Sequence, residues 1–290
     1  MLKSYFTINK KYDVNTMTQK ILRNVYTNLI KNEENLLGTV TTVTATTSLP
    51  TGLAYSQGAL SSTSIQTTYS FTVPANCLYF VATLIAGGGR GGNQNYQVAT
   101  KTFVSGGGGA GAWCKVLVTN TQFTAGTTQY YIRVGHQASA NATWSDAQGG
   151  STQLYDSANV TKLVEVTGGV SGVDNTFNAK GGDGGTFTTG LPYQSSVIEY
   201  GNGEAGEDAL ELGSAFVTDI AHFGQGGLGT YGTNGKGVLS WIGALQDAVG
   251  VDAGGYGSGG SGCANDMNGV INIYGGQGSG GYAQFDFYYQ

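Results

Sequence analysis

Alternating apolar and polar residues mark several short stretches between residue 71 and the C-terminus. The alternation appears on both sides of Pro74–Asn76, in FTV and then in CLYFVATLI. It returns in WCKVLVT at 113–119, in YYIRV at 130–134 and in the closing GYAQFDFYYQ. Because successive side chains of a strand point to opposite faces of a sheet, these runs predict strands with one buried face. We expect an all-β fold, a small antiparallel β-sandwich that the C-terminal strand closes.

Residues 15–36 follow a helical period instead. Five positions spaced by three or four residues form one seam, which consists of Leu22, Val25, Leu29, Asn32 and Leu36. This spacing predicts a short helix that precedes the β-fold. The helix either packs on its own domain or joins copies of the chain, in which case Asn32 would set the register of the seam.

The composition divides the chain into three parts. Residues 1–40 hold the predicted helix and form an attachment or oligomerisation segment. Residues 41–68 are uncharged and rich in Thr and Ser, which favours a linker or extended strands. Residues 69–290 form a glycine-rich β domain.

Glycine dominates the third part. The chain has 50 glycines in 290 residues, and only Gly38, Gly52 and Gly58 precede residue 87. Three prolines and irregular glycine spacing exclude collagen, while interleaved aromatic residues argue against a flexible linker. We therefore expect the glycine-rich loops to form polyproline-II helices packed backbone to backbone, with intervening loops that are free to vary. The main clusters lie at 87–92, 106–111, 181–185, 224–229, 254–262 and 275–281.

Charge and apolar runs narrow the class of protein. The formal net charge is −5, so the chain lacks the basic footprint of a nucleic-acid-binding protein. It has no run of 18 apolar residues, and its start, MLKSYFTINKK, has no secretory signal. We expect synthesis in a host cytoplasm and no membrane insertion. Three widely separated cysteines, Cys77, Cys114 and Cys263, predict buried thiols rather than a disulfide framework or a metal site.

Motifs for catalysis are weak. GNGEAG at 201–206 has the spacing of a dinucleotide fingerprint, but such spacing arises by chance in so glycine-rich a chain and no βαβ unit surrounds it. Four acidic residues would share a face if their segment were helical, although a solvated acidic loop is favoured: Glu204, Glu207, Asp208 and Glu211. His136 and His222 stand alone. We predict no catalytic residue, no metal and no cofactor.

Four glycine motifs are similar to those of a known family. IAGGGRGG, GGGGAGAW, GGDGG and GGQGSGGYAQFDF resemble the glycine-rich adhesins at the tips of T-even-like phage long tail fibres, and related phage fibre and spike domains. The resemblance covers about residues 69–290 and leaves the first 68 residues unmatched. It implies packed polyproline-II helices whose connecting loops bind host outer-membrane proteins or surface glycans. Trimers are common among such fibres, and the helix seam is compatible with one.

The function we expect is that of a bacteriophage fibre or spike adhesin, exposed on the virion, that recognises a protein or glycan of the host surface. Its N-terminal region would contact other virion proteins or join copies into a homo-oligomer. Exposed Tyr and Trp can stack on sugar rings or anchor protein contacts. The receptor-binding candidates are therefore the aromatic residues of the variable inserts, namely Trp144, Tyr193, Tyr200, Tyr231, Trp241 and Tyr256. The alternatives are a structural spike without receptor binding and a glycan-degrading tailspike.

Overall fold

The computed structural model describes residues 52–56, 66–94, 103–138, 148–174, 179–212, 219–237, 239–242, 249–265 and 273–289. The chain divides into two compact units, residues 1–48 with 290 and residues 49–289, and all described residues belong to the second. The predicted helix and its seam therefore lie outside the described residues. Within them, no helix is long and apolar enough to cross a membrane. The short 3-10 turn η2 (Gln194–Ser196) interrupts an otherwise β architecture.

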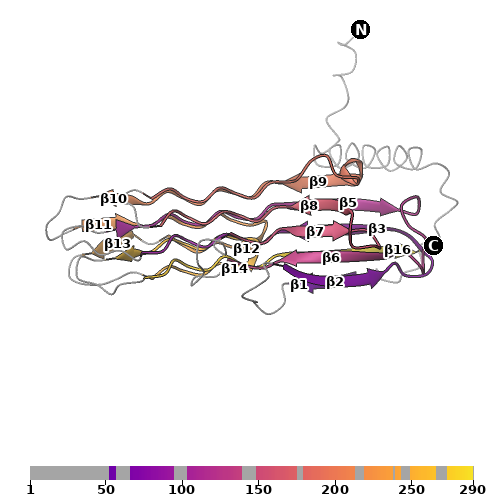
Figure 1. Cartoon of the computed structure of the whole chain (residues 1–290). Coiled ribbons are helices and arrows are strands. Elements are labelled where there is room, and N and C mark those ends of the chain that lie inside the picture. The colour runs from indigo at the N-terminus through magenta and orange to yellow at the C-terminus, as the bar shows by residue number, and fades with distance from the viewer. Residues whose placement is uncertain are drawn as a thin grey trace, which may run out of the picture. The chain divides into compact units, whose positions relative to one another are not determined.

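Two antiparallel sheets form the sandwich and confirm the all-β prediction (Figure 1). One sheet has the order β1 (Gly52–Ser56), β16 (Tyr282–Tyr289), β3 (Cys77–Ile85), β5 (Trp113–Thr119) and β9 (Val197–Gly201). The other has the order β2 (Gln66–Thr72), β6 (Gln129–Gly135), β7 (Thr152–Tyr155) and β8 (Lys162–Val166). The boundary expected at residue 69 falls within β2, and β1 lies in the segment expected to be a linker or extended strands.

Aromatic side chains from the two sheets fill the space between them. Phe71 of β2 lies 4.4 Å from Phe285 of β16, measured between ring centroids, and 5.8 Å from Tyr130 of β6. Phe80 of β3 and Phe287 of β16 complete this cluster, and both are buried. Burial alternates along β5, β6 and β16, as the sequence pattern predicts. The sandwich is thus an ordinary core in which apolar side chains leave water.

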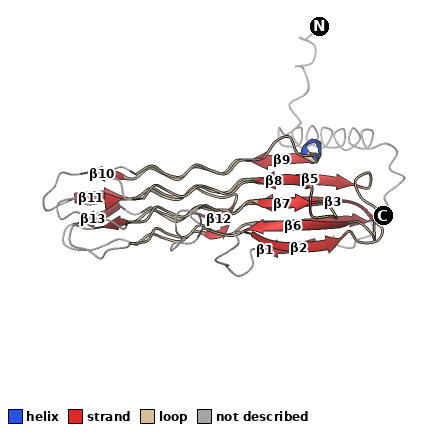
Figure 2. Cartoon of the chain, viewed as in Figure 1, coloured by secondary structure: helices blue, strands red, loops and turns tan. Residues whose placement is uncertain are grey.

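Glycine-rich segments continue the strands beyond one end of the sandwich and lie side by side (Figure 2). We call this assembly the glycine bundle; its described segments are 86–94, 105–112, 167–174, 179–186, 202–209, 223–229, 234–237, 249–253, 257–263 and 274–281. Hydrogen bonds from one segment to a given neighbour recur at every third residue, as in the bonds that Ala86, Gly89 and Gly92 donate to segment 105–112. The N–H of Gly89 donates to the carbonyl of Gly109, and that of Gly92 to the carbonyl of Gly106, both at 2.9 Å. Three residues per turn is the repeat of the polyproline-II helix, as predicted.

Segment 105–112 runs through the middle of the bundle. Its N–H and carbonyl groups bond to segments on every side, among them 86–94, 179–186, 202–209, 223–229 and 257–263. A Cβ built on Gly108 would fall well inside 3.0 Å of the carbonyl oxygens of Gly89 and Arg90, closer than real Cβ atoms come. The absence of side chains at such positions is what lets the main chains approach one another.

Three small antiparallel sheets accompany the bundle. At the end away from the sandwich, β4 (Phe103–Val104) pairs with β15 (Ala264–Asn265), and β11 (Asp219–His222) lies between β10 (Leu210–Leu212) and β13 (Leu239–Ile242). Closer to the sandwich, β12 (Tyr231–Thr233) pairs with β14 (Gly254–Tyr256). These short strands tie neighbouring bundle segments together at the points where the chain turns.

Candidate functional site

Several inserts of the sequence leave and rejoin the bundle at the same end, which we call the insert end. Gln94 and Ile273 form a bridge there, which joins the start of insert 95–102 to the end of insert 266–272. The β4–β15 pair joins the other two ends of the same inserts. The β10–β11–β13 sheet brings together the ends of inserts 213–218 and 243–248. The N–H of Val173 donates to the carbonyl of Lys180, which joins the two ends of insert 175–178.

A buried ion pair fixes the backbone near the insert end. The Arg90 guanidinium donates to both carboxylate oxygens of Asp174, at 3.1 and 3.0 Å, and the two side chains are only 2% and 5% exposed. The same carboxylate accepts the backbone N–H of Asn93. A bidentate pair of this kind has a fixed geometry, so it holds segments 86–94 and 167–174 in register. Inserts 95–102 and 175–178 follow these two segments in the sequence.

A small apolar cluster also holds the bundle segments together near the insert end. Phe223, Ala179 and Ala209 of three bundle segments are buried there together with Val104 of β4 and Ala264 of β15. The insert end is therefore tied by a salt bridge, by short sheets and by side-chain packing, in addition to the main-chain bonds of the bundle.

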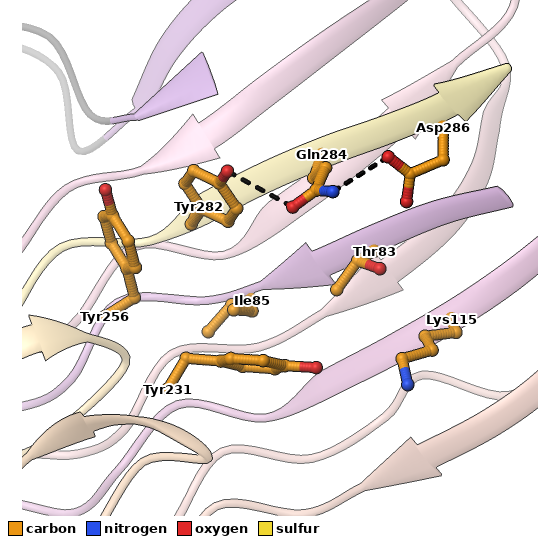
Figure 3. A pocket seen from close by; sticks show the side chains of 8 residues that line it. All are labelled: Thr83, Ile85, Lys115, Tyr231, Tyr256, Tyr282, Gln284 and Asp286. Carbon is orange, nitrogen blue, oxygen red and sulfur yellow. Dashed lines mark hydrogen bonds between the residues drawn. The ribbon is translucent and has the colours of Figure 1, made fainter. Parts of the chain in front are cut away.

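A groove lies on the outer face of the larger sheet, next to the β12–β14 pair, with a volume of about 440 Å³ (Figure 3). Thr83 and Ile85 of β3 line it together with three residues of β16. Those three side chains form a chain of hydrogen bonds: the Tyr282 hydroxyl donates to Gln284 Oε1 at 3.4 Å, and Gln284 Nε2 donates to Asp286 Oδ1 at 2.8 Å. Alternate residues of β16 thus present connected polar groups along one side of the groove.

Tyrosines of the β12–β14 pair close one end of the groove. The Tyr256 ring stacks on Tyr282 with centroids 4.4 Å apart, and Tyr231, which is 46% exposed, lies across the groove with its hydroxyl toward Lys115 (Figure 3). The ammonium group of Lys115 donates to Glu199 Oε2 at 2.9 Å. This hydrogen bond raises the pKa of Lys115, so the side chain stays cationic at neutral pH. Desolvation, together with Tyr256 and Asp286, raises the pKa of Tyr282, which stays a hydrogen-bond donor.

The structure separates the six aromatic candidates of the sequence. Tyr231 and Tyr256 meet in the groove. Tyr193 packs against the sandwich core, and its hydroxyl lies 3.0 Å from that of Tyr130. Tyr200, on the edge strand β9, is 60% exposed and tilts against Phe187 with ring centroids 4.8 Å apart. Trp144 lies outside the described residues, and Trp241 of β13 pairs with Ile220 of β11.

The motifs weighed for catalysis belong to the bundle. In GNGEAG, the N–H groups of Gly203 and Gly206 donate to the carbonyls of Gly185 and Gly182, so these amides are already occupied and do not cradle a phosphate. The acidic segment that follows is extended rather than helical, and Asp208 accepts the N–H of Gly181 at 2.8 Å. Within the described part of the chain, no three His, Cys, Asp or Glu side chains gather to hold a metal ion.

Sequence reasoning overlooked most of the groove. Lys115, Gln284 and Asp286 are the polar positions of strands that it had predicted, and their outward direction follows from the alternation. The sequence did not indicate where the β12–β14 pair lies. This pair brings Tyr231 and Tyr256 beside β3 and β5, which are more than 100 residues away in the sequence. The Arg90–Asp174 pair gave no signal, since one partner is a single cation within a glycine cluster.

The described residues form a β-sandwich continued by a main-chain-bonded glycine bundle, whose segments bring the ends of several inserts together. A comparison with known families agrees at the level of the scaffold. Residues 63–289 match the family described as glycine-rich domain, and the chain belongs to that family. No curated protein matches the chain.

Proposed function

We propose that this protein is a non-enzymatic adhesin of a bacteriophage fibre or spike, which recognises the host cell surface through the inserts of its bundle. One observation carries the proposal: inserts 95–102, 175–178, 213–218, 243–248 and 266–272 are far apart in the sequence, yet their ends meet at the insert end. Segments that differ in length and composition but share one end of a rigid scaffold are typical of recognition surfaces.

The construction of the bundle suits this role. Its described segments are joined by main-chain hydrogen bonds, which do not depend on side-chain identity. The Arg90–Asp174 pair and the short sheets fix the ends of the inserts before any partner binds. Fixing these ends in advance reduces the ordering cost of binding and so favours affinity.

The assignment to a phage rests on the glycine motifs, which resemble those of tail-fibre tip adhesins. The receptor would be a surface protein or a glycan of the host. The N-terminal region would attach the chain to other virion proteins, or join copies of it through the seam of Leu22, Val25, Leu29, Asn32 and Leu36. The protein would then lie on the exposed surface of the virion after synthesis in the host cytoplasm.

Two other functions lead to different results in the same test. A structural spike would be present in virions without binding cells. A glycan-degrading tailspike would use a pair of carboxyl groups across the bond it cleaves. Asp286 is the single carboxylate among the described residues that line the groove, which favours binding over hydrolysis there.

The test is binding of the purified full-length protein to a panel of intact bacteria, scored together with its ability to block phage adsorption. We expect saturable binding restricted to certain strains, and competition with the phage on those strains. Replacing insert 213–218 or 243–248 by Gly/Ser segments of the same length should abolish or redirect this binding.

The matched control changes the exposed β7–β8 turn in the sandwich, where Asn159 has a positive φ of 56° that glycine adopts readily and Val160 is 76% exposed. The double change Asn159→Gly and Val160→Ser should leave binding intact. If no strain binds the protein although virions contain it, the protein is a structural spike. Release of soluble saccharides from the bound cells would instead identify a tailspike enzyme.

A further inference from the structure

The groove beside β12 and β14 has the properties of a ligand site separate from the insert end. We propose that it binds an uncharged hexopyranose unit of a saccharide. Its volume of about 440 Å³ lies in the lower part of the range of small-molecule sites, which is about 300 to 1000 Å³. Three properties of its lining favour such a ligand: the placement of the tyrosines, the linked polar groups and the balance of charge.

The tyrosines offer flat, rigid surface that is still open to solvent. Tyr231 is 46% exposed, although a ring of this size gains free energy from burial. Tyr256 is held against Tyr282 by stacking, so both rings are positioned before a ligand arrives. A pyranose ring has an apolar face of C–H groups, which can pack on such a tyrosine while the sugar hydroxyls point sideways.

The polar groups of β16 meet the needs of those hydroxyls. Gln284 accepts from Tyr282 through Oε1 and donates to Asp286 through Nε2, which fixes the orientation of its amide. Each amide and carboxylate oxygen can accept more than one hydrogen bond, and the second amide hydrogen of Gln284 can still be donated. The Thr83 hydroxyl adds a further donor and acceptor on the floor of the groove. Preorganised donors and acceptors at neighbouring positions match adjacent hydroxyls on a sugar ring.

The balance of apolar and polar residues favours a polyhydroxylated ligand over an apolar peptide. Ile85 is the single aliphatic residue among the described residues that line the groove; the others are aromatic, hydroxylated, amide-bearing or charged. An apolar side chain placed here would desolvate Gln284 and Asp286 without replacing their bonds to water. A saccharide replaces those bonds.

The charges select an uncharged sugar. Lys115 is already paired with Glu199 at 2.9 Å. Asp286 adds a negative charge, and none of the ion pairs among the described residues includes it. The groove and its rim thus have more negative than positive charge, so a sialylated or phosphorylated sugar would be repelled.

The test measures direct binding of methyl hexopyranosides with glucose, galactose and mannose configuration to the full-length protein by saturation-transfer NMR, together with an array of neutral and sialylated oligosaccharides. We expect saturable binding of at least one neutral sugar in the millimolar range, which is common for a small ligand with few contacts. Tyr231→Ala and Gln284→Ala should each weaken it at least tenfold.

Tyr288→Ala is the matched control. Tyr288 is also partly exposed, at 37%, and lies on the same strand and face as Gln284, but it stacks on Tyr79 away from the groove. This variant should bind the sugar as the unchanged protein does. The proposal is overturned if no neutral sugar binds saturably, if Tyr231→Ala and Gln284→Ala bind as well as the control, or if sialylated sugars bind better.

This proposal is independent of the adhesin proposal, and the two can fail separately. Replacing an insert should remove strain-specific cell binding and leave binding of the methyl hexopyranoside intact. Tyr231→Ala should weaken binding of the methyl hexopyranoside and leave strain-specific cell binding intact. If the protein binds the sugar but no bacterium, the proposal for the groove stands and the adhesin proposal fails.

Discussion

The sandwich and the glycine bundle consist of the same chain segments continued end to end, yet different atoms hold them together. In the sandwich, aromatic rings such as Phe71, Phe80 and Phe285 meet between two sheets. In the bundle, the N–H and carbonyl groups of segments such as 86–94 and 105–112 meet directly, with no side chain between them. The first region is stabilised mainly by removing apolar surface from water, the second mainly by satisfying main-chain hydrogen bonds in a tightly packed array.

This difference decides which substitutions each region tolerates. An apolar core accepts other apolar side chains of similar volume. The bundle accepts no added atom at its inward glycines, because the neighbouring atoms are backbone and cannot turn away. The main-chain bonds of the bundle do not depend on side-chain identity, whereas burial in the sandwich constrains every second residue of its strands.

The largest effect is expected for Gly108→Val in the middle of the bundle. The new side chain would collide with the carbonyl groups of Gly89 and Arg90, so segments 86–94 and 105–112 would have to separate. We expect a loss of more than about 5 kcal/mol in the free energy of unfolding, which puts this change among the most severe single substitutions. The yield of folded protein and its thermal unfolding, followed by circular dichroism, measure it.

Ala205→Val provides the control for Gly108→Val. Ala205 is an exposed position of segment 202–209, so this change adds methyl groups to a bundle segment on its solvent side. We expect it to shift the free energy of unfolding by no more than about 0.5 kcal/mol. Equal losses in the two variants would show that β-branching, rather than the close approach of main chains, limits the bundle.

The next effect is expected for Phe285→Ala in the sandwich. Phe285 is fully buried and contacts Phe71, Phe80 and Tyr55, so its removal leaves a cavity that the two sheets cannot close. We expect a loss of about 4 kcal/mol, measured by urea unfolding. Phe285→Leu should recover more than half of it. If Phe285→Ala were as damaging as Gly108→Val, the two regions would not differ in tolerance as argued.

A smaller loss is expected for Asp174→Asn, which leaves the buried Arg90 guanidinium without its counter-charge. Breaking one side of a buried pair costs about 3 kcal/mol. The corresponding change in the exposed Lys115–Glu199 pair, Glu199→Gln, should cost less than about 1 kcal/mol. Urea unfolding of both variants gives the comparison. Equal small losses would show that the Arg90–Asp174 pair does not fix the insert end.

The sequence allowed the sandwich to be predicted in large part, because the strands of its core show their period of two. β3, β5, β6 and β16 were each expected from alternation. β7 was not expected, since all four of its residues are buried and no alternation exists to be found. Three residues per turn in the bundle followed from the properties of glycine. The pairing of segments did not, because identical glycine runs carry no information about their neighbours.

The site was less predictable for the same reason. Tyr231 and Tyr256 could be singled out as aromatic residues of inserts, but only the hydrogen-bonded order of the bundle segments places them against β16. The same composition argument had included Tyr193, which the structure places against the sandwich core. A residue type can therefore indicate a candidate, whereas the neighbours that give it a function depend on long-range pairing.

The smallest effect concerns the order in which the regions open, and buried thiols report it. Burial raises the pKa of Cys114, in the sandwich, and of Cys263, in the bundle, to about 12 in each case. Since the neutral thiol is favoured in the folded state, this contribution to stability is complete below the ordinary pKa of 9.0 and is lost as the pH rises toward 12. At pH 8, neither thiol should react with a thiol reagent while the protein is folded.

As urea is added below the unfolding midpoint, we expect Cys263 to react before Cys114, as measured by mass spectrometry of the labelled peptides. Ordering glycine costs more conformational entropy than ordering other residues, and the bundle has few apolar side chains to offset that cost, so its local opening requires less free energy. Labelling of both thiols at the same urea concentration would mean that the two regions unfold as one cooperative unit. The main-chain hydrogen bonds of the bundle would then be as strong a source of stability as the aromatic core.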